Sequence, residues 1–278
     1  MTSEEARIQL AKDVGDYIRS TTTALADAQT GLTDTALIDQ NVDLLLTKQT
    51  SVYIKAAQTG GPVADEERAS STFDGTSKLV ARRNFSVTLP ASIIYEMHRW
   101  WSGTEKNDAI TAALALCFPI IWKRLTSDVT MVADQYDYDI TATGYYQNSP
   151  RQVRLVSASD TELDQLISDW RPKGNQYLHI EFFPVAGRKL RLEGIGMPAI
   201  ADVSSPQSLI VSARAAMYLC EQAMASAPND QIGRYGLIYQ NAARMFVERV
   251  VRFAQPAMAA TKLSDSVMGI TDVDWSVT

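Results

Sequence analysis

Two runs of alternating apolar and polar residues flank a turn in residues 177–198, YLHIEFFPVAGRKLRLEGIGMP. The apolar positions on one face are Leu178, Ile180 and Phe182 in the first run and Leu190 and Leu192 in the second. A period of two is typical of half-buried antiparallel strands, with one face on a core and one on solvent. The intervening VAGR segment contains Gly187, which suits a hairpin turn. The stretch therefore predicts a β-hairpin.

Two segments upstream show the same alternation and extend this prediction to a small sheet. They are Gln135–Ile140 and Arg151–Val156. A short helix is expected between the strands, at Thr161–Trp170. Because strands joined by short turns pair as antiparallel neighbours, residues 129–200 are predicted to form an antiparallel β domain.

Helical periodicity dominates the chain on both sides of this domain. Two amphipathic helices are expected within residues 1–59, the first running to about Leu25 and the second, after Gly31, to Ala56. A second pair of helices is expected within residues 201–255 and is expected to pack with the first pair. Each helix has one apolar face, so each needs a partner surface.

The segment between the first helices and the β domain changes character. Residues 60–77, GGPVADEERASSTFDGTS, are small, polar and acidic. They show neither the helical period nor the strand period, which predicts an extended loop. The elements expected after the loop are a strand at Asn84–Leu89 and helices at Ala91–Trp101 and at about Asn107–Leu125. At the end of the chain, residues 256–278 have isolated apolar side chains and no period, so they are expected to form an arm.

These assignments predict an α+β fold. It consists of an amphipathic helix bundle with a small antiparallel β-sheet domain inserted before the C-terminal helix pair, plus an extended loop and a C-terminal arm. The expected parts are a helical pair at 1–59, a loop and helical insertion at 60–128, the β domain at 129–200, the C-terminal helix pair at 201–255 and the arm at 256–278.

The composition is that of an ordinary globular protein and argues against several classes. The chain has 278 residues, 46% of them hydrophobic, and a formal net charge of −6. Global disorder is therefore not expected, and an acidic chain does not grip DNA through bulk charge. Cys117 and Cys220 are expected to be buried thiols. The longest apolar run, Ala109–Trp122, is too short to span a bilayer.

Residues that could support catalysis or metal binding are few and poorly spaced. Neither of the two histidines, His98 and His179, has a cysteine or a second histidine at ligand spacing. Asp134, Asp137 and Asp139 lack the offsets of a calcium loop, and strand alternation places Asp137 and Asp139 on a solvated face. The Gly-Ile-Gly that ends the hairpin precedes Met-Pro rather than a phosphate-binding helix. We therefore expect no catalytic, metal or cofactor site.

Between Thr130 and about Glu221 a set of features follows in a fixed order: Gln135-Tyr136-Asp137-Tyr138, Pro150-Arg151-Gln152-Val153-Arg154-Leu155-Val156, Trp170, the hairpin that runs into Pro198, a Ser-Ser-Pro linker and the Ala-rich helix at Leu209–Ala225. This order of elements resembles that of the head-to-tail adaptor, or connector, proteins of tailed bacteriophages. The opening helices are also similar, so the resemblance covers about two-thirds of the chain. The Gly60–Leu125 region departs from the family pattern, and we interpret it as an insertion with contacts particular to this virus.

The resemblance implies a structural virion protein that is not an enzyme. The family forms a ring, commonly of twelve copies, between the portal and the tail and around the DNA passage. The expected partners are further copies of the chain, the portal protein and a tail or nozzle protein, with no membrane and no cofactor. DNA is expected to pass without sequence-specific binding, which an acidic channel favours by repelling phosphates. The implied location is the virion neck, after assembly in the host cytoplasm.

Two alternatives to the adaptor remain open at this point. One is another phage neck or tail ring protein, such as a tail terminator or a tail-tube component, whose copies would also assemble into a ring. A small-molecule hydrolase with a site between the helices and the sheet is the other alternative.

Two sets of residues are candidates for contacts with partners. The apolar side chains of the arm are expected to dock against the portal, and the alternative is that the arm folds back onto its own subunit; they are Met268, Ile270, Val273 and Trp275. The side chains expected between subunits are Arg244, Arg249, Arg252 and Phe73. The arginines would meet acidic groups of a neighbour, and the alternative is that they meet phosphate.

Overall fold

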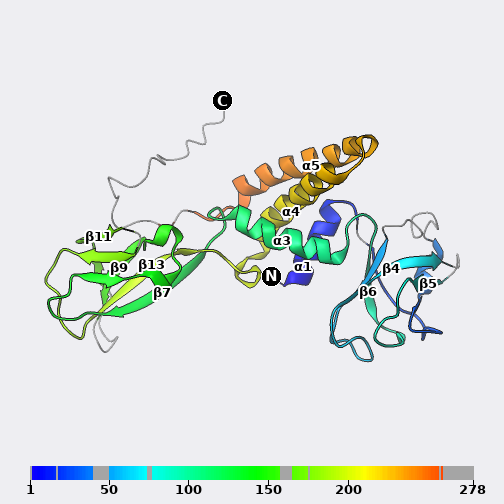
Figure 1. Cartoon of the computed structure of the whole chain (residues 1–278), viewed down its shortest axis with the longest axis horizontal. Helices are drawn as coiled ribbons and strands as arrows, with labels where there is room; N and C mark the ends of the chain where they lie inside the picture. Colours follow the sequence, from blue (N-terminus) through cyan, green and yellow to red (C-terminus); the bar gives the residue numbers. More distant parts are fainter. Residues whose placement is uncertain are drawn as a thin grey trace. The chain divides into compact units, whose positions relative to one another are not determined.

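The computed structural model describes residues 2–16, 18–39, 50–73, 77–156, 165–174, 176–256 and 258. The fold is a mixed α+β structure with antiparallel sheets, which confirms the predicted class at that level. The chain forms two compact units (Figure 1): unit 1 is Met1–Cys117 with Ala199–Ala254, and unit 2 is Phe118–Pro198 with Gln255–Thr278. The five-part division made from the sequence is finer and stays a prediction.

Unit 1 contains a six-stranded antiparallel sheet in the order β1-β6-β3-β4-β5-β2. Its strands are β1 (Ile18–Thr21), β2 (Gly31–Thr33), β3 (Ser51–Ile54), β4 (Glu66–Phe73), β5 (Lys78–Ala81) and β6 (Ile94–His98). A bridge between Ala24 and Thr33 places the segment after β1 beside β2, at the other edge. The sheet therefore curls around one core. This core includes Leu32, Val52, Ile54, Phe73, Leu79, Phe85, Leu89, Ile93, Tyr95 and Met97.

The helices of unit 1 form a layer with α4 at its centre. The described helices are α1 (Ser3–Asp13), α3 (Gly103–Cys117), α4 (Ser205–Ser226) and α5 (Asn229–Phe253), with short 3-10 turns at Thr35–Asp39 and Ile200–Asp202. Helix α4 packs against α1, α3 and α5 (Figure 1). Its buried residues include Ala213, Ala215 and Ala216, whose small side chains let neighbouring helices approach closely. The two predicted C-terminal helices are thus confirmed.

Unit 2 consists of two small antiparallel sheets. Its strands are β7 (Lys123–Thr130), β8 (Asp137–Asp139), β9 (Gln152–Val156), β10 (Gln165–Ile167), β11 (Trp170–Lys173), β12 (Tyr177–Ile180) and β13 (Lys189–Gly196), with 3-10 turns at Thr141–Thr143 and Tyr146–Asn148. One sheet has the order β10-β9-β13-β7 and the other β11-β12-β8. They share a core that includes Met131, Tyr138, Ile140, Tyr145, Val153, Trp170, Leu178, Ile180, Leu190 and Leu192.

Close packing of Tyr145 against β13 predicts that Gly194→Ala destabilises unit 2 by about 1–3 kcal/mol. A Cβ on Gly194 would lie 2.4 Å from Cδ1 of Tyr145, whose hydroxyl donates to the Leu192 carbonyl at 2.8 Å. The ring could move away only by giving up that bond. Urea unfolding measures the change. The control is Gly233→Ala in α5, where a Cβ meets nothing within 4 Å; an equal loss in both variants would contradict the packing argument.

The predicted hairpin of residues 177–198 is wrong in its pairing, although both strands exist. Strand β12 pairs with β11 and β8, whereas β13 pairs with β9 and β7. The connection between β12 and β13 contains Pro184 and is longer than a tight turn, so it transfers the chain from one sheet to the other. The alternation that predicted strands at Gln135–Ile140 and Arg151–Val156 is confirmed by β8 and β9.

Two predicted helices of unit 1 are strands where the structure describes them. The helix expected after Gly31 is replaced by β2, a 3-10 turn and β3, with residues 40–49 outside the described part. The helix expected at Ala91–Trp101 is replaced by β6. All four residues of β3 and four of the five in β6 are buried, so neither strand shows the alternation by which a strand is recognised.

The remaining corrections concern segments whose local sequence pattern predicted the wrong secondary structure or the wrong boundary. Residues 60–77 contain β4, in which only two of the eight residues are buried, so the strand has no run of apolar side chains by which to recognise it. Asn84–Leu89 forms bends that bury Phe85 and Leu89 without a strand. Within the helix expected at Thr161–Trp170, the described residues are β10, a two-residue link and the first residue of β11. The helices expected to reach Leu25 and Leu125 end at Asp13 and Cys117.

Candidate functional site

A buried charge network joins α1 and α3 to the sheet in unit 1. The side chains of Asp16 and Lys106 are fully buried, and Lys106 Nζ donates to Asp16 Oδ2 at 2.8 Å. The same ammonium lies 2.8 Å from Nδ1 of His98. An ammonium can only donate, so Nδ1 accepts and the ring proton resides on Nε2, 3.4 Å from Glu96 Oε2. The network thus continues from α3 into β6.

Arg7 of α1 completes the network with a two-point ion pair to Glu96. Its Nε donates to Oε2 at 2.9 Å and its Nη2 to Oε1 at 2.7 Å, and its guanidinium stacks 4.0 Å above the centre of the Tyr53 ring. Burial alone would raise the pKa of Glu96, but the two hydrogen bonds from Arg7, together with the nearby His98 ring, outweigh it and lower the pKa to about 2. Arg7 and Glu96 are both at most 5% exposed, so the network fixes α1 on the sheet.

Glu67 of β4 fixes the beginning of α3 in a similar way. Its carboxylate accepts the backbone N–H groups of Gly103 at 2.7 Å and Thr104 at 3.0 Å, and the hydroxyl of Ser51 at 2.5 Å. A carboxylate at this end of a helix is favoured by the helix dipole and satisfies orphan donors. Burial opposes ionisation here as well, but these hydrogen bonds lower the pKa of Glu67.

Arg249 links three helices within its own chain. It donates to both carboxylate oxygens of Asp13 in α1, at 2.6 and 2.9 Å, and to the Leu209 carbonyl in α4 at 2.7 Å. The predicted inter-subunit role of Arg249 therefore gains no support from its placement. Phe73 is likewise used internally, because it is 8% exposed and packs in the core of the six-stranded sheet.

Helix α5 leaves one long side uncovered. Among its described side chains only Ala242 is fully buried, although the helix has 25 residues. Leu237, Val247 and Val251 are 70%, 61% and 82% exposed. At about 100° per residue these three lie on the side of α5 opposite Ala242. Arg244 lies among them and is also exposed, as are Gln240 and Glu248 on the same side. We call this side of α5, with its three aliphatic side chains interspersed with polar ones, the α5 stripe.

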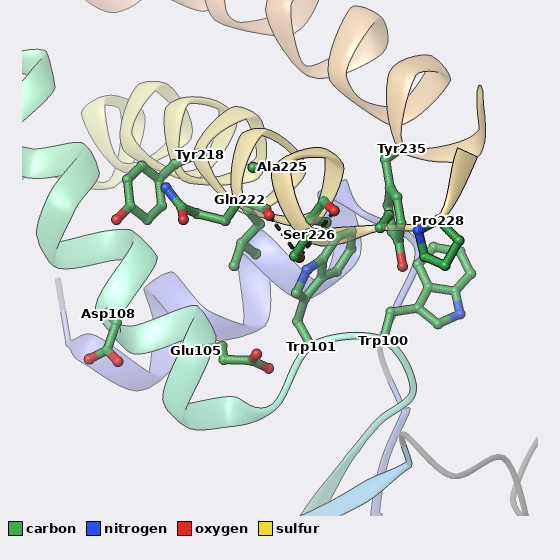
Figure 2. Close-up of a pocket in the computed structure, with 13 residues that line it drawn as sticks. Trp100, Trp101, Glu105, Asp108, Tyr218, Gln222, Ala225, Ser226, Pro228 and Tyr235 are labelled. Atoms are coloured by element: carbon green, nitrogen blue, oxygen red, sulfur yellow. Dashed lines mark hydrogen bonds between the residues drawn. The ribbon is translucent and has the colours of Figure 1, made fainter. Parts of the chain in front are cut away.

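A hollow of about 580 Å³ lies where the loop after β6, the start of α3, the end of α4 and the start of α5 meet (Figure 2). Its lining includes four aromatic side chains and two carboxylates, namely Trp100, Trp101, Tyr218, Tyr235, Glu105 and Asp108. The rings of Trp101 and Tyr235 are 5.8 Å apart between centroids. Figure 2 shows both carboxylates on α3, on neighbouring turns of the helix. We call this hollow the aromatic pocket.

The other residues singled out from the sequence are distributed over both units. Arg252 is exposed at the end of α5. Met268, Ile270, Val273 and Trp275 lie outside the described residues. Asp137 accepts from Lys173 at 2.5 Å and lies 2.7 Å from Nδ1 of His179, a surface cluster on a strand as expected. Cys117 and Cys220 are buried free thiols, and burial raises the pKa of each to about 12.

The buried charge network was missed because charged residues rarely lie in a core. One signal was available in the sequence: Lys106 is spaced three, four and seven residues from Ala109, Ile110 and Ala113, which form the buried face of α3. A lysine on such a face requires a buried partner. The identity of that partner, Asp16, depends on a contact ninety residues away and has no local signal.

Comparisons with known proteins leave the chain without an assigned relative. No protein-family model matches the chain, and no curated protein matches its sequence. In the described residues, no three His, Cys, Asp or Glu side chains are grouped so that they could hold a metal ion. A search of the same residues finds no helix of the length and apolarity needed to cross a membrane.

Proposed function

We propose that the chain is the structural subunit of a head-to-tail adaptor ring in a tailed bacteriophage. Its place would be the virion neck, where it joins the portal to the tail and forms part of the DNA channel without catalysing a reaction. The proposal is supported by the resemblance in the order of elements from Thr130 to Glu221 and by the surface of α5. Further copies of the chain, the portal and a tail or nozzle protein are its partners.

The observation that carries the proposal is the uncovered side of α5. Three aliphatic side chains that are more than 60% exposed lie on one side of a long helix. Exposed apolar groups cost about 25 cal/mol for each Å² that a partner could cover, so three of them on one side of a helix favour association. In a ring each copy meets two neighbours through different surfaces, and a stripe on one helix provides one of them.

In this proposal the helices of unit 1 form the body of the ring, and the sheets of unit 2 face outward or toward the tail. The net charge of −6 supports a channel that DNA crosses without being held, because like charges repel the phosphates. The apolar residues of the arm dock against the portal.

Ring formation is tested on the purified full chain by light scattering coupled to size exclusion and by electron microscopy, alone and with portal rings. We expect a closed ring, of twelve copies if the family pattern applies, that seats on the portal. A chain that stays monomeric both alone and with portal would contradict the proposal. Binding to tail tubes instead of portals would favour the tail-ring alternative.

Removal of residues 257–278 is expected to abolish portal binding while the protein remains folded. The four apolar side chains of the arm are removed together, whereas the described core residues of both units all precede residue 257. Co-sedimentation with portal rings measures the binding, and circular dichroism checks the fold. A matched variant keeps the arm and replaces Trp275 alone by Ala. Undiminished co-sedimentation of the truncated chain would contradict docking by the arm.

A further inference from the structure

The aromatic pocket and the α5 stripe are two different surfaces of unit 1 with complementary chemistry. We propose that the aromatic pocket of one copy binds the Arg244 side chain of a neighbouring copy, with the apolar residues of the α5 stripe packing around that contact. This inference rests on the proposed ring and names the contact that closes it.

The pocket has the composition of a site for an organic cation. Aromatic faces attract a guanidinium through their ring quadrupole, and carboxylates attract it by charge. Asp108 has neither a hydrogen bond nor an ion pair in the described part of the chain. Glu105 accepts the N–H and hydroxyl of Ser102 through Oε2, at 2.7 and 2.9 Å. Its second oxygen, Oε1, remains available to a ligand.

The pocket wall already accepts an arginine on one face. The Arg234 guanidinium carbon lies 3.8 Å above the centre of the Trp100 ring. This contact within one chain shows that the Trp100 side chain is oriented for stacking with a guanidinium. Trp101 and Tyr235 add two further rings beside it (Figure 2).

Arg244 cannot fill the pocket of its own chain. It follows Tyr235, which lines the pocket, by nine residues of the same helix. Nine residues correspond to a rise of about 13 Å and a rotation of about 180°, so Arg244 lies on the other side of α5. A second copy is therefore the source of the side chain.

Arg244 is also the cation of this chain best placed as a donor. In the described part of the chain its side chain makes one hydrogen bond, from Nη2 to Asn241 Oδ1 one turn earlier, at 3.3 Å. Leu237, Val247 and Val251 surround it on the stripe and offer apolar area to the aromatic walls. Arginine surrounded by apolar groups is the composition typical of interface hot spots. Because donor and acceptor surfaces differ, the contact repeats from copy to copy and can close a ring.

The chemistry of the pocket is tested with N-acetyl-arginine amide on the Arg244→Ala variant, whose pockets would be vacant. We expect the indole N–H signals of Trp100 and Trp101 to shift in NMR titrations. The neutral isostere N-acetyl-citrulline amide should produce at most a tenth of the response. Asp108→Asn, added to the same variant, should weaken arginine binding several-fold. No response, or an equal response to the citrulline compound, would overturn the pocket assignment.

The source of the arginine is tested by charge reversal in the full chain. Arg244→Glu and Asp108→Arg should each abolish rings, and the double variant should restore them. A mixture of the two single variants should also form rings in which the variants alternate, because every contact between unlike copies then joins opposite charges. Arg83→Glu, a reversal at another exposed arginine of unit 1, is the control and should retain rings.

The ligand titration and the charge-reversal experiment together distinguish failure of this inference from failure of the proposed function. Rings that persist in both single variants would overturn the contact but leave the adaptor proposal standing. A wild-type chain that is monomeric under all conditions would overturn the proposed ring. It would also overturn the assignment of a neighbouring copy as the source of the arginine, even if the pocket binds the arginine compound.

Discussion

Asp16→Ala is expected to lower the unfolding free energy by about 3–5 kcal/mol, because it leaves the Lys106 ammonium buried without its carboxylate. Both side chains are 0% exposed, and burial already lowers the pKa of Lys106 against the opposing effect of Asp16. The substitution also removes the acceptor of the Arg99 backbone N–H, which lies 2.5 Å from Oδ1. Urea unfolding followed by circular dichroism measures the loss.

Two further variants show whether the loss comes from the buried charge. Asp27→Ala breaks a surface pair with Lys78 in which the two side chains are 75% and 50% exposed, so less than about 1 kcal/mol is expected. Asp16→Asn combined with Lys106→Met removes both buried charges and should recover part of the stability lost in Asp16→Ala. A loss below about 1 kcal/mol in Asp16→Ala would show that the pair is not stabilising.

Acid is expected to remove the stability that Glu96 contributes. The pKa of Glu96 is about 2 in the folded protein, against an ordinary value of 4.5. A carboxylate with a lowered folded pKa stabilises fully above its unfolded pKa, and the contribution falls as the pH drops toward the folded pKa. Its full contribution is about 3 kcal/mol at pH 6, of which about 2 kcal/mol is lost by pH 3.

The Glu96→Gln variant isolates this contribution from other groups that titrate in acid. The difference in unfolding free energy between wild type and Glu96→Gln should narrow by about 2 kcal/mol between pH 6 and pH 3. The control is Glu4→Gln, a surface carboxylate paired with Arg19 and Lys55, for which less than about 1 kcal/mol is expected. A pH-independent difference for Glu96→Gln would show that its ion pair with Arg7 does not govern the acid response.

The sequence predicted those elements whose side chains alternate between core and solvent. Strand β9 and strand β12 were found in this way, and α4 and α5 were found by their helical period. Strands β3 and β6 were missed because they are covered on both faces, so their apolar and charged residues lost the period of two. The buried charged residue Glu96 in the middle of β6 weakened the sequence signal for a strand further.

The pairing of strands and the candidate site depended on contacts that sequence periodicity does not encode. Strands β12 and β13 are adjacent in sequence but belong to different sheets, because each finds more distant partners. The aromatic pocket needs Trp100 from the loop after β6 and Tyr218 from α4, which meet only when the helices of unit 1 assemble. The exposure of Leu237 and Val251 likewise follows from which side of α5 contacts α4.

The contact between Asp13 and Arg249 has a consequence for the order in which the protein is made. These residues are 236 positions apart, and at about 5–20 residues per second α1 precedes the end of α5 by roughly 10–50 s during translation. The strands of the six-stranded sheet and all of Phe118–Pro198 emerge in that interval and can fold first. Helix α5 is the last described helix to leave the ribosome. The surface of α5 proposed to join copies is therefore made only after the strands of unit 1 and all of Phe118–Pro198 have been synthesised.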